Sequence, residues 1–339
     1  MEFKIIKKTA TFLDPFNKMA LKNVAVEVRQ DPLTGRNARI RPFTSLTWTK
    51  PDLEALAAGT EARCPFCPQV ISKITPNFPE DILPEGRLAD GDLLLFPNIA
   101  PYDSLSAVVS LGEKHLVPMT GFEPERIARA FALTRRFFDR LESIRHPESV
   151  YHLINWNYMP PAGSSVIHSH LQVFASATAT NLLRAKLDAA RAYTAEHGTN
   201  FWDDLVKAEK DGERWIGDIG RTRWLSVFAP QGLMGDVTAV VDGAGTLFDL
   251  TDEDHLDLGR GIVRVLAGYD RMGLYSFNMG LYAGARNDAH ARLHLVLSPR
   301  LIISPAIGTS DISSLQHLQG DAFCLVYPEE IARKIRETF

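Results

Sequence analysis

The sequence of 339 residues contains only three cysteines, too few for the disulfide framework of a secreted scaffold. It has no apolar run long enough to span a bilayer, and residues 1–6 carry no apolar segment of signal-peptide length. It also lacks a basic excess, because its formal net charge is -4. These absences argue against a binder of nucleic acid or of an anionic membrane, and we expect a cytoplasmic protein.

What is present is the composition of an ordinary globular protein, with 45% hydrophobic and 23% charged residues. A chain of this length forms either one large domain or two similar halves, and both arrangements can bury a full core.

The chain repeats its own pattern of secondary structure. In the first half, an apolar run at 93–96 and a strand pattern at 105–110 precede a helical pattern and two further strand patterns, at 123–144, 151–157 and 166–176. The second half shows the same order at 225–230, 237–241, 251–272, 275–282 and 294–298. Each half therefore predicts a β-β-α-β-β unit. We expect an α+β fold with a mostly antiparallel sheet and flanking helices.

Two halves follow from this repeat, residues 1–180 and residues 181–339. A helical pattern over residues 181–214, rich in Ala, Leu, Lys and Glu, joins them. When the two halves are aligned, His170 falls on His294 and Gln172 falls on Val296. The first half is thus predicted to carry the catalytic residues, and the second to be a degenerate, structural copy that completes the site.

The chemistry is concentrated in the strand pattern of the first half. Side chains alternate along a strand, so His168, His170 and Gln172 are expected on one face. The loop before them, at 161–165, holds small residues whose backbone N–H groups can approach a phosphate. A neutral imidazole is a nucleophile toward phosphorus, and a neighbouring amide can stabilise the phosphoryl oxygens. The alternative is that these histidines are ordinary polar residues of an exposed strand face.

Cys64 and Cys67 form a Cys-x-x-Cys pair, which needs two further ligands to close a tetrahedral metal site. His115, after a strand pattern, and His168 are the candidates. A redox pair and two unrelated core thiols are the alternatives. Cys324, inside an apolar run, is predicted to be a buried thiol.

Five separated motifs occur in one order along residues 29–176. They are 31–35 (Asp-Pro-Leu-Thr-Gly), 64–67 (Cys-x-x-Cys), 96–98 (Phe-Pro-Asn), the strand-loop-His ending at His115, and 157–172, Asn-x5-Gly-x-Ser-x2-His-x-His-x-Gln. In this set the sequence resembles the galactose-1-phosphate uridylyltransferase branch of the histidine-triad superfamily.

That resemblance implies a role for each motif. His170 would attack the α-phosphorus of a nucleotide donor, and Gln172, which replaces a third histidine, would favour transfer over hydrolysis. The residues implied to contact nucleotide and phosphates are Phe96, Asn98, Asn157, Gly163, Ser164, Ser165 and Gln172. Cys64, Cys67, His115 and His168 would bind a structural zinc ion. The resemblance also implies a homodimer.

The function expected from the resemblance is UDP-hexose:hexose-1-phosphate uridylyl transfer by a ping-pong mechanism. The substrates would then be a nucleotide sugar or a dinucleotide and a phosphorylated acceptor. The first alternative is an ADP-sugar or dinucleoside polyphosphate phosphorylase that uses the same histidine, since His-Ser-His and His-x-His-Leu-Gln resemble those enzymes. The second alternative is a zinc-stabilised nucleotide-binding protein without turnover.

Overall fold

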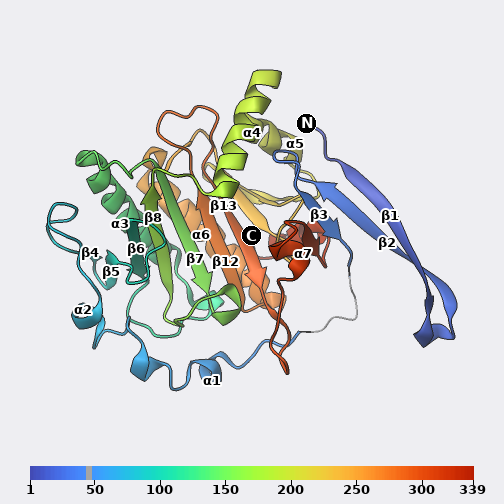
Figure 1. Cartoon of the computed structure of the whole chain (residues 1–339), viewed down its shortest axis with the longest axis horizontal. Helices are drawn as coiled ribbons and strands as arrows, with labels where there is room; N and C mark the ends of the chain where they lie inside the picture. The colour runs from blue at the N-terminus through green and yellow to red at the C-terminus, as the bar shows by residue number, and fades with distance from the viewer. Residues whose placement is uncertain (43–47) are drawn as a thin grey trace.

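A computed structural model describes residues 1–42 and 48–339 of the chain. Its centre is a ten-stranded sheet with the order β4-β5-β6-β8-β7-β12-β13-β11-β10-β9 (Figure 1). Every neighbouring pair in this sheet is antiparallel. The strands are β4 Leu88–Asp90, β5 Leu93–Pro97, β6 Leu105–Ser110, β7 Tyr151–Tyr158, β8 His170–Ser176, β9 Trp215–Ile219, β10 Thr222–Ser226, β11 Val237–Val241, β12 Ser276–Tyr282 and β13 His294–Arg300. The predicted α+β class with a mostly antiparallel sheet is confirmed.

The predicted tandem repeat is also confirmed. The order β5-β6-α3-β7-β8 recurs as β10-β11-α6-β12-β13, where α3 is Pro124–Ser143 and α6 is Asp252–Arg271. Read outward from the junction of β7 and β12, the two halves of the sheet have matching strand orders. Asn155 of β7 pairs with Gly280 of β12 at this junction. Because β8 and β13 occupy equivalent places, His170 and His294 begin equivalent strands.

Local sequence explains where the two long helices start and which face they cover. Thr251 and Asp254 form a reciprocal capping box at the start of α6, and Pro124 occupies the first turn of α3. Helices α3 and α6 pack against each other and contribute to the main apolar core. Leu171 and Val173 of β8 are fully buried in that core. Strand alternation therefore places the intervening Gln172 on the opposite face of the sheet.

Two sequence predictions need correction. The strand predicted at 166–176 starts only at His170, because residues 163–169 form a loop that places the His168 ring against the Gly112 carbonyl. The helical segment predicted at 181–214 is two helices, α4 Asn181–His197 and α5 Phe201–Glu209. Gly198, at a φ of 74°, ends α4, and the Asn200 side chain caps α5.

A second sheet has the order β1-β2-β3-β16, and its long β1–β2 hairpin projects from the body (Figure 1). Its strands are β1 Ile5–Asp14, β2 Ala20–Gln30, β3 Asn37–Ile40 and β16 Ala322–Cys324. The remaining elements are α1 Leu53–Ala57, α2 Ile71–Ile74, α7 Ser314–His317, α8 Pro328–Arg336, the pair β14 Ile302–Ser304 and β15 Thr309–Ser310, and the 3-10 turns Pro15–Asn17, Glu61–Arg63, Met119–Gly121, Pro160–Ala162 and Leu247–Asp249. Within the described residues, no helix combines the length and apolar character needed to cross a membrane.

Candidate active site and metal centre

His170 stands at the start of β8 with one ring nitrogen engaged. Its Nδ1 lies 2.9 Å from the backbone carbonyl oxygen of His168. A carbonyl oxygen only accepts, so Nδ1 carries the proton and Nε2 keeps its lone pair. Across residues 1–42 and 48–339, no hydrogen bond engages Nε2. Burial lowers the pKa of the His170 imidazole, which favours the neutral form.

His294 shows what the equivalent strand position looks like without a free nitrogen. Its Nδ1 lies 2.9 Å from the carbonyl oxygen of Arg292, as in the first half. Its Nε2, however, lies 2.8 Å from the Lys186 ammonium, which donates to it. The ring is also stacked on Tyr282, at a centroid distance of 5.0 Å, and lies against the tilted Trp202 ring at 3.9 Å. His294 is therefore blocked, whereas His170 presents a nucleophilic nitrogen.

The Gln172 amide is oriented by two donors. Its Oε1 accepts from the Asn157 amide at 2.9 Å and from the Tyr102 hydroxyl at 3.2 Å. With the oxygen so occupied, the orientation of the amide is fixed and Nε2 is left as a donor. No acceptor for this Nε2 is present in the described part of the chain. An amide N–H held two residues from His170 can donate to a phosphoryl oxygen.

The orientation of Gln172 is set by a relay of hydrogen bonds from the second half. Asn157 Oδ1 accepts from Asn278 Nδ2 at 2.7 Å, and Asn278 Oδ1 accepts from Arg300 Nη1 at 2.6 Å. Arg300 in turn pairs with the buried Asp311 carboxylate through three hydrogen bonds of 2.7, 2.8 and 3.1 Å. A guanidinium can only donate, so it determines which way each amide faces. The direction of the relay is thus fixed at its charged end.

The loop predicted to approach phosphate lies at the end of β7. Gly163 has a φ of 84°, which favours glycine there, and no heavy atom lies within 4 Å of the position of a Cβ. Asn278 Nδ2 holds the loop by donating to the Ala162 carbonyl at 2.8 Å. The Ser164 hydroxyl donates within the loop, to the Val166 carbonyl at 2.7 Å. The structure thus places this loop beside the relay. The Ser165 side chain makes no hydrogen bond to another described residue.

Phe96 and Asn98 lie at the other side of β8. Phe96 pairs with Val108 of β6, and Val108 pairs with Gln172, so the three residues share one rung of the sheet. The Phe96 ring is buried, and its centroid lies 5.4 Å from that of Phe66. Asn98 follows β5 in a turn where its Oδ1 accepts from the Ala100 N–H at 3.0 Å. Phe96 thus lies on the same sheet face as Gln172, two strands away.

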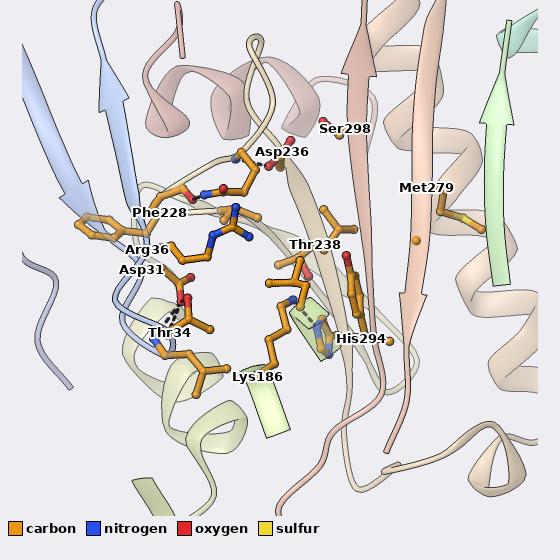
Figure 2. Close-up of a pocket in the computed structure, with 18 of the residues that line it drawn as sticks. Asp31, Thr34, Arg36, Lys186, Phe228, Asp236, Thr238, Met279, His294 and Ser298 are labelled. Atoms are coloured by element: carbon orange, nitrogen blue, oxygen red, sulfur yellow. Dashed lines mark hydrogen bonds between the residues drawn. The ribbon is translucent and has the colours of Figure 1, made fainter. Parts of the chain in front are cut away.

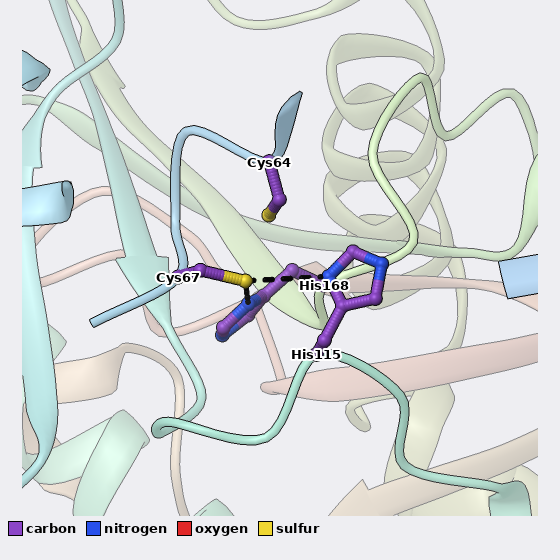
Figure 3. Close-up of side chains that lie close together, drawn as sticks. All are labelled: Cys64, Cys67, His115 and His168. Carbon is purple, nitrogen blue, oxygen red and sulfur yellow. Dashed lines mark hydrogen bonds between the residues drawn. The ribbon is translucent and has the colours of Figure 1, made fainter. Parts of the chain in front are cut away.

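The four predicted metal ligands form one cluster (Figure 3). One ligand atom from each of Cys64, Cys67, His115 and His168 lies within 4.8 Å of the others. Cys67 Sγ is 3.5 Å from His115 Nδ1 and 3.7 Å from His168 Nδ1. The outer nitrogens are held elsewhere: His168 Nε2 donates to the Gly112 carbonyl at 2.7 Å, and His115 Nε2 lies 2.7 Å from the Thr60 hydroxyl. Both Nδ1 atoms are thereby directed at the cluster, a donor set that fits a tetrahedral metal ion.

The cluster is joined to the candidate active site by a residue inside the Cys-x-x-Cys segment. The Phe66 ring packs edge-on against His170 at a centroid distance of 5.0 Å and against His168 at 6.3 Å. Cys64 and Cys67, on either side of Phe66, therefore determine where this ring lies. Phe66 is a contact that the sequence prediction missed, although its place between the two cysteines was the available signal.

Other functional contacts had no local signal. Tyr102, Asn278 and Arg300 support Gln172 and Asn157 but were not among the predicted site residues. Asn278 and Asn157 are 121 positions apart in the chain. Asn157, a predicted nucleotide contact, donates to Gln172 and accepts from Asn278 within the relay.

Comparison with known proteins identifies relatives of the whole chain. No family model matches the sequence. An uncharacterised protein of Archaeoglobus fulgidus is 31% identical over 315 residues, which cover 92% of each chain. The structure resembles that of an ADP-glucose phosphorylase from Arabidopsis thaliana with bound ADP-glucose, at 19% identity, a TM-score of 0.71 and coverage of 92% of this chain and 99% of that one.

Two further solved structures have a similar fold. A galT-like protein of Arabidopsis thaliana is 19% identical with a TM-score of 0.70, and the match covers 91% of this chain and 98% of that one. A uridylyltransferase is 21% identical with a TM-score of 0.64, over 92% of this chain and 97% of that one. At these identities the likeness concerns the fold.

Proposed function

The chain belongs to the family of the Archaeoglobus fulgidus protein and has the fold of the galactose-1-phosphate uridylyltransferase branch. From this premise we propose that it transfers a nucleoside monophosphate through His170. One observation carries this proposal. His170 and His294 start equivalent strands and share the same Nδ1 hydrogen bond, but only His170 has a free Nε2.

The reaction has two balanced steps. In the first, the Nε2 lone pair of His170 forms a bond to the α-phosphorus of the donor. The bond from that phosphorus to the leaving phosphate oxygen breaks, and the oxygen keeps the electron pair. In the second, a phosphate oxygen of the acceptor attacks the same phosphorus and the P–N bond breaks, which returns the lone pair to Nε2. Nδ1–H, bonded to the His168 carbonyl, stabilises the positive charge on the ring.

The Gln172 amide supports both steps. Its Nε2–H donates to a non-bridging oxygen of the phosphoryl group, where charge develops in the transition state. Gln172 supplies no proton-transfer group, which favours transfer to a phosphate acceptor over attack by water. We place the nucleoside beside Phe96 and Asn98 and its phosphates at the loop of Gly163, Ser164 and Ser165.

The favoured donor is a UDP-sugar with a sugar 1-phosphate as acceptor. Adenylyl transfer from an ADP-sugar or a dinucleoside polyphosphate is the second candidate, supported by the His-Ser-His sequence. Incubation with α-³²P-labelled UDP-glucose, ADP-glucose and ATP tests both. We expect one covalent, acid-labile and base-stable label per chain, and the donor that labels best identifies the base. No label with any of the three would contradict nucleotidyl transfer.

We further propose that the Cys-His cluster binds a structural zinc ion. Ideal tetrahedral zinc with thiolate and imidazole ligands has sulfur–nitrogen edges of about 3.6 Å. The two observed distances from Cys67 Sγ, 3.5 and 3.7 Å, support this assignment. Such an ion would hold the segment 64–67, and with it Phe66, against the catalytic strand.

The division of roles between residues 1–180 and 181–339 belongs to the same proposal. Residues 1–180 hold the nucleophile and the cluster, and residues 181–339 complete the site by orienting Gln172 through Asn278 and Arg300. We also propose a homodimer, which light scattering coupled to size exclusion tests by giving twice the chain mass of 37.7 kDa.

Asn278→Asp tests the relay. The substitution keeps the size of the side chain and the contact with Arg300, but removes the donor to Asn157 Oδ1 and to the Ala162 carbonyl. We expect the Gln172 amide to lose its fixed orientation and kcat to fall by about 10- to 100-fold, with a smaller change in KM for the donor. Steady-state kinetics and the melting temperature check this. A lowered melting temperature with unchanged kcat would show that Asn278 has only a structural role.

A further inference from the structure

On the sheet face opposite the core, a cavity of about 520 Å³ lies over strands of the second half of the chain (Figure 2). Strands β11, β12 and β13 form its floor, and the segment 31–36 and helices α4 and α5 form its walls. Arg36 and Asp31 stand on one side, and Lys186, Thr238 and His294 stand on the other (Figure 2). The cavity extends to Gln172 of the first half, so it is continuous with the proposed phosphate position.

The carboxylates that line this cavity are already engaged. Asp31 accepts from the backbone and hydroxyl of Thr34 at 2.6 and 2.8 Å. Glu209 forms an ion pair with Arg214 at 2.9 Å. Asp236 accepts from the Gln231 N–H at 2.6 Å, from the Gly232 N–H at 3.2 Å and from Ser298.

The two cations that line the cavity lack such partners. In the described chain, neither Lys186 nor Arg36 has a carboxylate within ion-pair distance. Arg36 makes one long hydrogen bond, of 3.5 Å, to the Gly320 carbonyl. Lys186 donates to His294 and lies over the Tyr282 ring, 4.1 Å from its centroid. Their charges therefore remain available to an anion inside the cavity.

The environment of Lys186 makes an anionic ligand favourable. Burial lowers the pKa of this ammonium to about 8, because few polar groups replace its hydration. The charged groups that face it are Asp31, Arg36 and Asp236, and the adjacent His294 is neutral because burial and Lys186 hold its pKa well below the usual value. A half-buried cation with no carboxylate within ion-pair distance is stabilised when an oxyanion binds beside it.

The register of the sheet sets the length of such a ligand. Gln172 of β8 pairs with Asn155 of β7, Asn155 with Gly280 of β12, and Gly280 with Val296 of β13. Three strand spacings separate Gln172 from Val296, which is about 14 Å. His294 and its partner Lys186 lie at the β13 end of this path. A group at Lys186 thus lies well away from the phosphate that reacts at His170.

We propose that the part of the substrate opposite the nucleotide carries a second anionic group, a phosphate or a carboxylate, which binds between Lys186 and Arg36. This inference rests on the proposed function, since it names the acceptor class of that site: a phosphorylated polyol or sugar with an anionic group at its far end. Hydroxyl groups of Ser298 on β13 and Tyr282 on β12 line the cavity and suit the polyol between the two anions. A plain sugar 1-phosphate leaves both cations unsatisfied.

Calorimetric binding of three probes to the wild-type chain tests the inference. Glucose 1-phosphate has one anionic group, glucose 1,6-bisphosphate has a second phosphate, and glucuronic acid 1-phosphate has a second carboxylate. We expect at least one of the doubly anionic probes to bind about tenfold or more tightly than glucose 1-phosphate. Which of the two binds better identifies the second group. Equal affinities for all three probes would overturn the inference.

Variants locate the preference. Lys186→Met and Arg36→Gln lie on different elements, and each is expected to reduce the preference to about twofold or less. Lys210→Met, which removes an exposed lysine outside the cavity, should retain it. A preference that persists in both cavity variants would overturn the assignment. Calorimetric binding needs no turnover. If the doubly anionic probes bind more tightly but no donor labels His170, the proposed nucleotidyl transfer is wrong and the anion site stands.

Discussion

His170→Ala is expected to lower the turnover of the nucleotide donor by at least about 10⁴-fold and to abolish covalent labelling. The substitution removes the atom proposed as the nucleophile, Nε2 of a neutral imidazole. No neighbouring group can replace it, because the Gln172 amide is a donor and the His168 ring is engaged with Gly112. Single-turnover kinetics with the best donor measure the loss.

His294→Ala is the matched control for this experiment. It removes a histidine from the equivalent strand position, with the same Nδ1 contact, but one whose Nε2 is already bonded to Lys186. The covalent label should therefore still form at one per chain. Label that survives in His170→Ala and is lost in His294→Ala would reverse the roles assigned to the two halves.

Cys67→Ala is expected to abolish the proposed zinc binding and to lower the free energy of unfolding by about 4 kcal/mol or more, the range seen when a structural metal site is lost. Cys67 Sγ contacts the Nδ1 atoms of both His115 and His168, so its removal leaves two imidazoles directed at an incomplete site. Metal analysis should fall from one zinc per chain to near zero. Denaturant unfolding at a fixed zinc concentration measures the change in stability.

Cys324→Ala controls for the loss of a buried thiol. Cys324 is fully buried, and its Sγ–H donates to the Val326 carbonyl at 3.1 Å, away from the cluster. This variant should keep its full zinc content. Equal zinc in Cys67→Ala and the wild type would refute the four-ligand site. Because Phe66 packs on His170, we also expect the metal-free protein to label more slowly than the wild type.

Part of this architecture could be predicted from local sequence. The tandem β-β-α-β-β pattern depends on hydrophobic periodicity, and the start of α6 depends on the capping pair Thr251 and Asp254. Both signals lie within short stretches of sequence. The prediction of the Cys-His cluster depends on the Cys-x-x-Cys spacing, which has few other uses in proteins. The Cys64-x-x-Cys67 spacing predicts the four candidate ligands, and the fold brings His115 and His168 to the two cysteines.

The rest depends on tertiary contacts that no short window contains. Arg300 and Asn278 orient Gln172 from the other half of the sheet, and amides on a strand face look like ordinary polar residues in sequence. Lys186 lies on helix α4, which has both apolar and charged residues, and a lysine on such a helix normally faces solvent. The late start of β8 has the same origin, since His168 turns toward the cluster instead of extending the ladder.

The most direct test of the central claim is the mass of the labelled peptides. Trypsin separates the two equivalent histidines, because residues 146–184 form one fragment with His168 and His170 and residues 293–300 form another with His294. After a brief incubation with the labelling donor and digestion at neutral to basic pH, we expect the fragment 146–184 to gain the mass of one nucleoside monophosphate. Fragmentation should place that mass on His170. An adduct on the fragment 293–300, on another residue of the fragment 146–184, or on no fragment with any donor would contradict the account.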